Sequence, residues 1–340
     1  MSSMLVANRP RGLVRKAQPT GSDVFISFPL TNLSISYMQA TDIYIADKVF
    51  PVVPVQVQGG LIWVWNRSDF MRDEARPRAD GAESAGGGFN LSTTPYRCDV
   101  IAFHKDIGDQ TRKNAASILD LDRAATNYVT GKQLIRRERS WFGSFFTTGV
   151  WGTDVTGVSS GPSTGQVLQW NVSTATPAVD IDLYKAAILG ATGFMPNTLV
   201  LGYQTFAALR NNADIRDRFK YTSADSIDEA MLARYFGIEQ VLVSKAVYES
   251  AVEGAATSAV TLIAGKGALL VYAAPSASLM SVSGGYTFSW DGYLGSGYQM
   301  TRISKMRVEI LKSDRIEGEM AYAQKVVAAD LGVYFTTVVA

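Results

Sequence analysis

The sequence predicts an α+β fold, and three patterns carry that prediction. Residues 43–65 and 96–103 alternate apolar and polar positions and are rich in Val, Ile and aromatic residues, which is typical of β-strands. Residues 120–146 place apolar side chains mostly three, four or seven positions apart, the spacing of one helix face. Residues 190–275 alternate short strand and helix patterns, as an α/β unit does.

The helix expected over 120–146 is long for a globular protein. Ser117 and Asp120 precede it and are of the residue types that cap helix N-termini. Its second half carries cations, which suit the negative end of the helix dipole: Arg136, Arg137 and Arg139.

Composition sets the broad class of protein. A chain of 340 residues with 47% hydrophobic and 19% charged residues is globular, and its length suggests about two domains. The net charge of +1 gives no global field that would recruit nucleic acid or an acidic substrate. Cys98 is the one cysteine, which excludes an internal disulfide and fits a reducing compartment.

Neither a secretory signal nor a membrane span is expected. The chain does not open with a basic segment followed by an apolar run. The two long uncharged stretches, 186–209 and 267–290, are interrupted by glycine, proline or serine, whereas a spanning helix needs about 20 predominantly apolar residues. We therefore expect a soluble chain, intracellular at synthesis, without a membrane partner.

The first 30 residues predict an extended arm, because Pro10, Pro19 and Pro29 forbid a regular helix. The arm is either a frayed terminus or a segment that becomes ordered only against a neighbour. Its basic residues face no acid before Asp23: Arg9, Arg11, Arg15 and Lys16.

The segment 70–90 is rich in Asp, Glu, Arg and Gly, and it lies between the strands expected at 61–65 and 96–103. Since strands flank it on both sides, the chain goes out and returns. We predict a long projecting hairpin and not a linker between domains.

The hairpin also contains patterns that resemble ligand sites. Its acids, Asp73, Glu74, Asp80 and Glu83, suit a hard cation, but the ligand spacing of a calcium loop is missing and arginines are interleaved. The triple glycine Gly86–Gly88 lacks the Gly-Lys-Ser/Thr ending of a phosphate-binding loop. We expect no metal and no cofactor here.

Catalytic residues are not apparent either. One histidine, His104, and one cysteine, Cys98, leave little material for His-based catalysis or a His-rich metal site. Cys98 alternates with Val100 on a strand pattern, which indicates an inert buried thiol. We predict that the protein is not an enzyme.

The rest of the chain is predicted as follows. Residues 149–178 are expected to be loop and 180–189 a short helix. A capping box at Ser226–Glu229 opens a helix that Gly237 ends. Further strands are expected at 198–202, 240–244, 260–264 and 268–272, a helix at 203–210, and strand-rich structure over 298–339.

Several ordered blocks are familiar: YIADKVFPVVPV (44–55), FMRDEARPRADGAESAGGGF (70–89), YRCDVIAFHKDIGDQTRKNA (96–115), LDLDRAATNYVTGKQLIRRE (119–138), FFTTGVWGTDVT (145–156), TGFMPNTLVLGYQTFAALRNNADIRDRFKY (192–221) and DRIEGEMAYAQKVVAADLGVYF (314–335). With these blocks the chain resembles, from about Leu30 onward, the major capsid proteins of tailed bacteriophages. That family shares the fold named after phage Hong Kong 97.

The resemblance implies the architecture of that α+β fold. It has an N-terminal arm, an extended β-hairpin called the E-loop, a peripheral domain with a long spine helix, and an α/β axial domain. In this chain the corresponding ranges are the arm at 1–50, the E-loop hairpin and its base strands at 51–110, the peripheral domain at 111–189 with its spine helix at 120–146, the axial domain at 190–275, and return strands to the peripheral domain at 276–340.

Some members of the family join subunits through an isopeptide bond from an E-loop lysine. This chain has no lysine between Lys48 and Lys105, so non-covalent contacts are expected instead. Arginine suits them, because its planar group pairs with carboxylates bidentately. The expected intersubunit contacts are Arg72, Asp73, Glu74, Arg76, Arg78, Asp80 and Glu83, with a hinge at Gly86, Gly87 and Gly88.

The resemblance implies a structural protein that self-assembles into pentamers and hexamers of an icosahedral shell around double-stranded DNA. Its partners would be its own copies, a portal protein, the packaged DNA without sequence specificity, and scaffolding or decoration proteins. The arm cations Arg9, Arg11, Arg15 and Lys16 are candidates for inner-surface DNA contact. The location would be the virion, assembled in the cytoplasm of a host bacterium. The alternatives are an encapsulin-like compartment that stores a cargo enzyme and an enzyme that uses the acidic hairpin.

Overall fold

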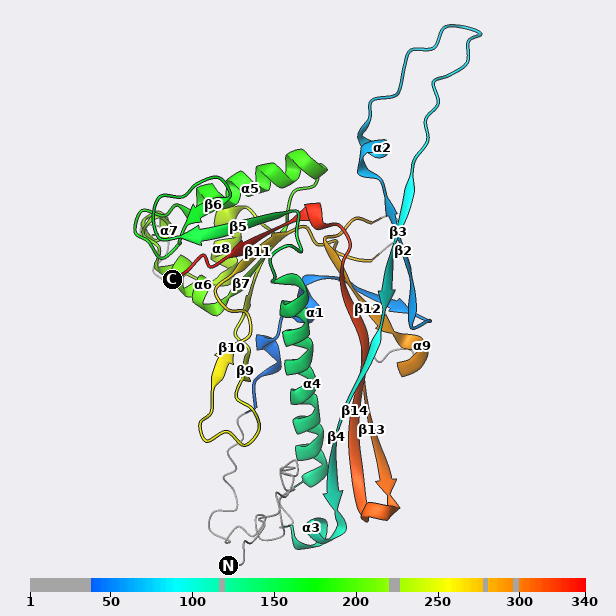
Figure 1. The fold of residues 1–340 in the computed structure, drawn as a ribbon, viewed down its shortest axis with the longest axis vertical. Helices are drawn as coiled ribbons and strands as arrows, with labels where there is room; N and C mark the ends of the chain where they lie inside the picture. Colours follow the sequence, from blue (N-terminus) through cyan, green and yellow to red (C-terminus); the bar gives the residue numbers. More distant parts are fainter. Residues whose placement is uncertain (1–37, 116–119, 220–226, 278–280, 296–299) are drawn as a thin grey trace, which may run out of the picture.

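A long helix forms the axis of the molecule. The computed structural model describes residues 38–115, 120–219, 227–277, 281–295 and 300–340. Helix α4 (Leu121–Phe145) has one β-sheet along its side and a second sheet at its C-terminal end, and a hairpin projects far beyond both (Figure 1).

Helix α4 fulfils the expectation for residues 120–146. The Asp120 carboxylate accepts a 3.0 Å hydrogen bond from the Arg123 backbone N–H and so caps the helix, as predicted. The buried side of α4 packs on strand β14 (Ser313–Val326), where Gly318 allows the close approach. A Cβ at this position would lie 2.7 Å from Cγ1 of Val129.

The sheet beside α4 is built around β14. Strands β4 (Asp99–Gly108), β12 (Gly285–Trp290) and β13 (Thr301–Val308) all pair antiparallel with β14, and β1 (Val52–Val55) pairs parallel with β12. Apolar side chains of the sheet and of α4 form a small buried cluster: Ile107, Ala125, Val129 and Ile316.

The second sheet has six strands, and its two faces have different neighbours. One face packs on helices through Leu199, Leu201 and Leu270, and the other faces the C-terminal end of α4. Its strand order is β6 (Gln166–Leu168), β5 (Thr153–Val158), β15 (Gly332–Thr336), β11 (Ala268–Val271), β7 (Thr198–Gly202) and β8 (Gln240–Ser244). The surrounding helices are α5 (Pro177–Thr192), α6 (Tyr203–Asn211), α7 (Ala213–Phe219) and α8 (Glu229–Phe236).

Aromatic rings join the two sheets at the end of α4. Phe50 lies 4.8 Å from Phe145 and 6.0 Å from Trp141, measured between ring centroids. The Trp151 indole N–H donates a 2.7 Å hydrogen bond to the Phe145 carbonyl. Burial of these large rings contributes several kcal/mol, roughly 1.5–3 kcal/mol for each side chain. The short helix Ala46–Val49, at the end of the predicted arm, is therefore fixed to the centre of the molecule.

The remaining elements are short or project from this body. Strands β2 (Gly59–Trp65) and β3 (Leu91–Arg97) form the antiparallel stem of the projecting hairpin. A second small hairpin pairs β9 (Val247–Glu249) with β10 (Val260–Leu262). The short helices are α1 (Ala46–Val49), α2 (Arg67–Met71), α3 (Asp109–Asn114) and α9 (Asp291–Leu294), and the 3₁₀ turns are Thr41–Ile43, Glu309–Leu311 and Ala329–Leu331.

Some sequence predictions were wrong in position. The return strand of the hairpin is β3 at Leu91–Arg97, whereas most of the expected strand at 96–103 belongs to β4 and pairs with β14. The expected loop at 149–178 contains β5 and β6. Asp228, and not Ser226, caps α8 by accepting from the Met231 N–H, and Ser226 lies outside the described residues.

The C-terminal strands also divide differently from the prediction, which returned all of residues 276–340 to the domain of the long helix. Strands β12, β13 and β14 do lie in the sheet beside α4. Strand β15 instead lies between β5 and β11 in the six-stranded sheet. Local alternation identifies a strand but not its partner, and that partner decides the sheet.

Candidate functional site

The projecting hairpin beyond its β2–β3 stem is the first candidate site. All seven predicted contact residues lie on it and are exposed: Arg72, Asp73, Glu74, Arg76, Arg78, Asp80 and Glu83. Arg72 lies 3.6 Å from Asp69 and 3.7 Å from Glu74, at the long end of ion-pair distances. For the other charged residues of this tip, no ion pair is found within the described chain. The tip thus presents unpaired charges of both signs to solvent.

A polar clasp closes the base of the tip. The Asp69 carboxylate accepts a 2.8 Å hydrogen bond from the Asn90 backbone N–H and a 3.1 Å bond from its side-chain amide. Asn66 caps α2 through the Ser68 N–H at 3.2 Å, and its own N–H donates to the Asn90 carbonyl. The clasp holds the outgoing and returning segments of the hairpin together at the point where strands β2 and β3 end.

Next to this clasp lies an exposed aromatic cluster, which the sequence prediction missed. The Trp65 ring lies 4.9 Å from Phe89 and 5.8 Å from Phe70, and the last two are 6.0 Å apart. Phe70 remains 54% exposed and Phe89 61% exposed. Leu61 and Trp63 continue the apolar surface down the stem. The alternation in LIWVW was the available signal, because it places residues 61, 63 and 65 on one strand face.

The predicted hinge glycines are exposed but not in a strained conformation. Gly86, Gly87 and Gly88 are absent from the glycines with positive φ, whereas Gly81, in the turn at 80–82, has φ +75°. Gly81 is the position of the tip where the backbone favours glycine. The role of residues 86–88 as a hinge remains a prediction.

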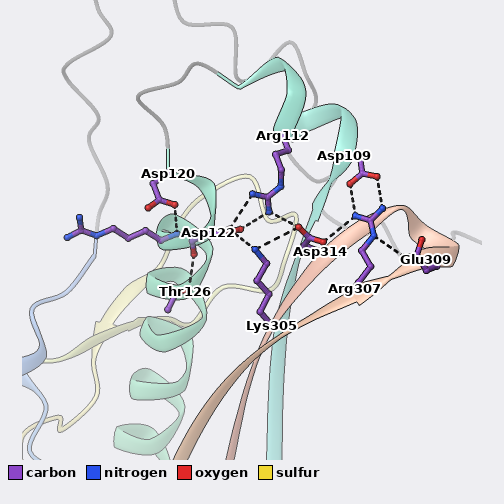
Figure 2. Close-up of polar contacts among 10 residues, drawn as sticks. Asp109, Arg112, Asp120, Asp122, Thr126, Lys305, Arg307, Glu309 and Asp314 are labelled. Carbon is purple, nitrogen blue, oxygen red and sulfur yellow. Dashed lines mark hydrogen bonds and ion pairs between the residues drawn. The ribbon is translucent and has the colours of Figure 1, made fainter.

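A network of ion pairs at the opposite end of the molecule is the second candidate site (Figure 2). Arg307 donates two 2.6 Å hydrogen bonds to Asp109, one to each carboxylate oxygen. Asp122, at the start of α4, accepts from Arg112 and from Lys305, each at 2.7 Å. The network therefore joins α3, the N-terminal end of α4 and the β13–β14 turn.

Charge pairing in the network changes the acidity of its carboxyl groups. Hydrogen bonds from Arg112 and Lys305 lower the pKa of Asp122 to about 2. The Arg307 guanidinium likewise lowers the pKa of Asp109. Asp314 lies 3.1 Å from Arg112 and 3.2 Å from Arg307 and so connects the two halves.

The network holds an apolar turn out in solvent. Ile310 is 95% exposed and Leu311 55% exposed, both in the 3₁₀ turn between β13 and β14. Lys312 ends this turn with φ +44°, and its carbonyl accepts from the Asp109 N–H. An exposed isoleucine on a fixed turn is suited to contact another protein surface.

Between these two ends, Glu138 connects three parts of the chain. Its carboxylate accepts hydrogen bonds from the N–H groups of Ala46 at 2.8 Å and Ile45 at 3.0 Å, and from the Ser244 hydroxyl at 2.8 Å. Burial raises the pKa of Glu138, while these donors favour its charged form. The neighbouring Arg137 forms an ion pair with Asp47.

The other residues that the sequence analysis considered are Cys98, His104 and the cations of the arm. Cys98 is fully buried against Tyr286 and Phe288, and burial raises the pKa of its thiol to about 11, as expected for an inert thiol. His104 lies 3.9 Å from Asp106 on an exposed stretch of β4. The arm residues Arg9, Arg11, Arg15 and Lys16 lie outside the described residues.

Within the described ranges, no group of three or more His, Cys, Asp or Glu side chains is placed to hold a metal ion. No helix in those ranges is long and apolar enough to cross a bilayer. What the geometry provides is exposed apolar and charged surface at both ends of an elongated body.

Solved structures with the same fold include a viral capsid and an encapsulin. A phage-related protein from Bordetella bronchiseptica RB50 aligns over 87% of this chain and 93% of its own, with a TM-score of 0.65 and 20% identity. The capsid of cyanophage P-SCSP1u aligns over 97% and 98%, with a TM-score of 0.58 and 11% identity. An encapsulin from Synechococcus elongatus PCC 7942 aligns over 90% and 92%, with a TM-score of 0.51 and 11% identity.

The chain therefore has the Hong Kong 97-type capsid fold, and the predicted α+β fold class is confirmed. In sequence it is similar to the major capsid protein of Burkholderia phage BcepMu, with 22% identity over 230 residues, which are 64% of this chain and 68% of that protein. This similarity confirms the resemblance to phage capsid proteins. No protein-family model matches the chain.

Proposed function

We propose that this chain is the major capsid protein of a tailed bacteriophage, a structural protein and not an enzyme. Its copies form pentamers and hexamers, and these close into an icosahedral shell around double-stranded DNA. The observation that carries the proposal is the aromatic cluster on the projecting hairpin. Two phenylalanines that stay more than half exposed in the single chain are suited to burial against another copy.

The hairpin acts as the E-loop in this proposal and the six-stranded sheet with its helices as the axial domain. The aromatic cluster provides the apolar centre of a contact, and the charged tip provides its polar rim. Burial of each phenylalanine contributes roughly 1.5–3 kcal/mol, and each exposed ion pair at most about 1 kcal/mol. A closed shell repeats these small terms in every subunit, so they add by multiplicity.

The shell needs partners that the single chain does not contain. We propose a portal protein and, as further candidates, scaffolding and decoration proteins. The DNA is held without base readout, through its phosphates. Assembly takes place in the cytoplasm of the host bacterium, and the protein then resides in the virion.

Expression of the protein alone tests the proposal. We expect shells or capsomers by negative-stain microscopy. Phe70→Ser with Phe89→Ser, and separately Arg72→Ala with Arg76→Ala, should remain small species with an unchanged circular dichroism spectrum, because the hairpin contacts are lost while the body stays folded. The aromatic pair should have the larger effect.

Two matched controls change exposed residues elsewhere. Val252→Ser alters a side chain that is 79% exposed near the small hairpin, and Arg216→Ala with Arg234→Ala removes two exposed cations near the six-stranded sheet. Both should assemble as the unaltered protein does. Normal shells at normal yield from both hairpin variants would contradict the proposed role of the hairpin.

The second candidate is an encapsulin-like compartment, which the similarity to an encapsulin favours. It would enclose a cargo enzyme and no genome. The genes beside the coding sequence separate the two candidates. A portal or terminase gene supports the capsid, and a gene for a cargo enzyme supports the compartment.

A further inference from the structure

A stripe of cations follows one face of α4. Lys132, Arg136 and Arg139 are spaced four and three residues apart, so they lie on the same side of the helix, and all three are exposed. None of them has an ion-pair partner within the described ranges. The acids of this helix are engaged elsewhere, because Asp122 belongs to the ion network at its start and Glu138 is buried.

The stripe continues into a hollow at the end of the helix. The hollow has a volume of about 460 Å³ and lies between α4, the turn before β11 and the end of β15. Arg139 and Lys266 both line it, and threonine side chains add hydroxyl groups: Thr147, Thr336 and Thr337. The surface is therefore cationic and rich in hydrogen-bond donors.

Aromatic rings support two of these cations without neutralising them. The Arg139 guanidinium lies 4.6 Å from the Tyr248 ring centroid, and the Lys132 ammonium lies 5.5 Å from that of Tyr128. A cation on a ring face keeps its charge and can still donate hydrogen bonds at its edge. The rings thus restrict the side chains while leaving them able to bind an anion.

We propose that this cationic face, formed by Lys132, Arg136, Arg139 and Lys266, binds the phosphate backbone of double-stranded DNA. The inference deepens the proposed function and rests on it, since it assigns this face of α4 to the inside of the shell. Along a helix, residues 132 to 139 span about 10 Å. Duplex DNA carries one phosphate per strand for about every 3.4 Å of its axis, so a stretch of this length offers enough phosphates for three cations.

An acidic protein segment fits this face less well. Protein interfaces have an apolar centre, but from residue 129 to the end of α4 the described helix exposes no large hydrophobic side chain. The chain's own arm fits poorly too, because residues 1–37 contain four cations and one acid.

A duplex-binding titration tests the inference on the full-length protein as dissociated subunits or free capsomers, because a closed shell would keep the duplex away from its inner face. The probe is a fluorescent 30-base-pair duplex, followed by anisotropy over a range of salt concentrations. The test variant is Lys132→Gln with Arg136→Gln and Arg139→Gln. The control, Arg123→Gln with Arg216→Gln and Arg234→Gln, removes the same charge from exposed positions elsewhere.

For the test variant we expect the slope of log K against log salt to become shallower by about 3, since each phosphate contact contributes about 0.9. Its affinity at about 0.15 M salt should fall on the order of 100-fold. The control should change the slope by less than about 1. Equal losses in both variants, or no loss in the test variant, would overturn the inference.

Two further measurements on the same proteins separate the outcomes, with shell formation scored under assembly conditions and duplex binding scored on dissociated subunits. If polyglutamate of equal charge binds through the stripe more tightly than the duplex, the partner is an acidic protein and the inference is wrong. Microscopy reports shell formation independently. Stripe-dependent duplex binding without shells would count against the proposed capsid function alone, whereas shells without stripe-dependent binding would count against this inference alone.

Discussion

At the residue scale, Glu138 is a buried carboxylate that accepts hydrogen bonds from three different residues. It lies on α4 and accepts these hydrogen bonds from the backbone N–H groups of Ile45 and Ala46, at the start of α1, and from the Ser244 hydroxyl of β8. A buried carboxylate is tolerated when hydrogen bonds compensate its desolvation. This one residue therefore ties the end of the arm to both the long helix and the six-stranded sheet.

We predict that Glu138→Gln lowers the free energy of unfolding by about 2 kcal/mol at pH 7, because an amide nitrogen then faces the donors that a carboxylate oxygen accepted. Urea denaturation measures the change. Ser244→Ala removes only one of the three donors and should lose less. A Glu138→Gln protein as stable as the parent would show that these bonds do not support the arm.

Cys98 gives a second prediction at this scale. Its thiol is fully buried and burial raises its pKa to about 11, so at pH 8 it is both enclosed and protonated. A disulfide reagent should leave the native protein unlabelled and should label one thiol per chain in urea. Rapid labelling of the native protein would mean that the β4–β12 region opens readily.

At the element scale, the ion network joins α3, α4 and the β13–β14 turn. Asp122 has its pKa lowered to about 2 in the folded protein, against about 3.9 in an unfolded chain. Its pairing therefore stabilises the fold above about pH 4, and this contribution is lost as the pH falls toward 2. Because its side chain is 36% exposed, each pair contributes at most about 1 kcal/mol.

We expect Asp122→Asn to be less stable than the parent by about 1 kcal/mol at pH 7 and nearly equal to it at pH 2. Urea unfolding at a series of pH values gives both numbers. Added salt at about 1 M should shrink the difference at pH 7, since exposed pairs are screened. A difference that stayed constant from pH 7 to pH 2 would contradict the assignment.

The elements also show which parts of the fold could be predicted from the sequence. The long helix was predictable because its period and its Asp120 cap are local signals. The pairing of β4 with β14 could not be predicted, because it joins residues about 200 positions apart. Nothing in the local sequence of either strand indicates which strand it pairs with. The Gly-, Ser- and Thr-rich stretch before α5 read as loop, although Thr153–Val158 completes a parallel pair with β15.

The candidate site divides in the same way. The charged tip was visible as composition, and all its predicted residues are exposed there. The aromatic cluster was missed because Trp65, Phe70 and Phe89 come together only when the clasp at Asp69 joins the outgoing and returning segments of the hairpin. The stripe on α4 was seen only as cations near a helix end, since its significance depends on which side of the helix is left uncovered.

At the scale of the whole molecule, both ends present exposed apolar side chains, and α4 lies between them (Figure 1). The hairpin extends far beyond the body, and its tip lies away from the rest of the subunit (Figure 1). This shape is consistent with the proposed assembly, in which the exposed apolar side chains of the hairpin would be buried against another copy.

The position of β14 and β15 in the two sheets has a consequence for synthesis. Each is an interior strand, and both lie late in the chain, at Ser313–Val326 and Gly332–Thr336. While the ribosome is still translating residue 300, neither sheet can close. The projecting hairpin and helix α4 are therefore synthesised well before the two sheets that they pack against or extend from can form. Translation products that stop before Ser313 therefore lack an interior strand of each sheet and cannot complete the fold.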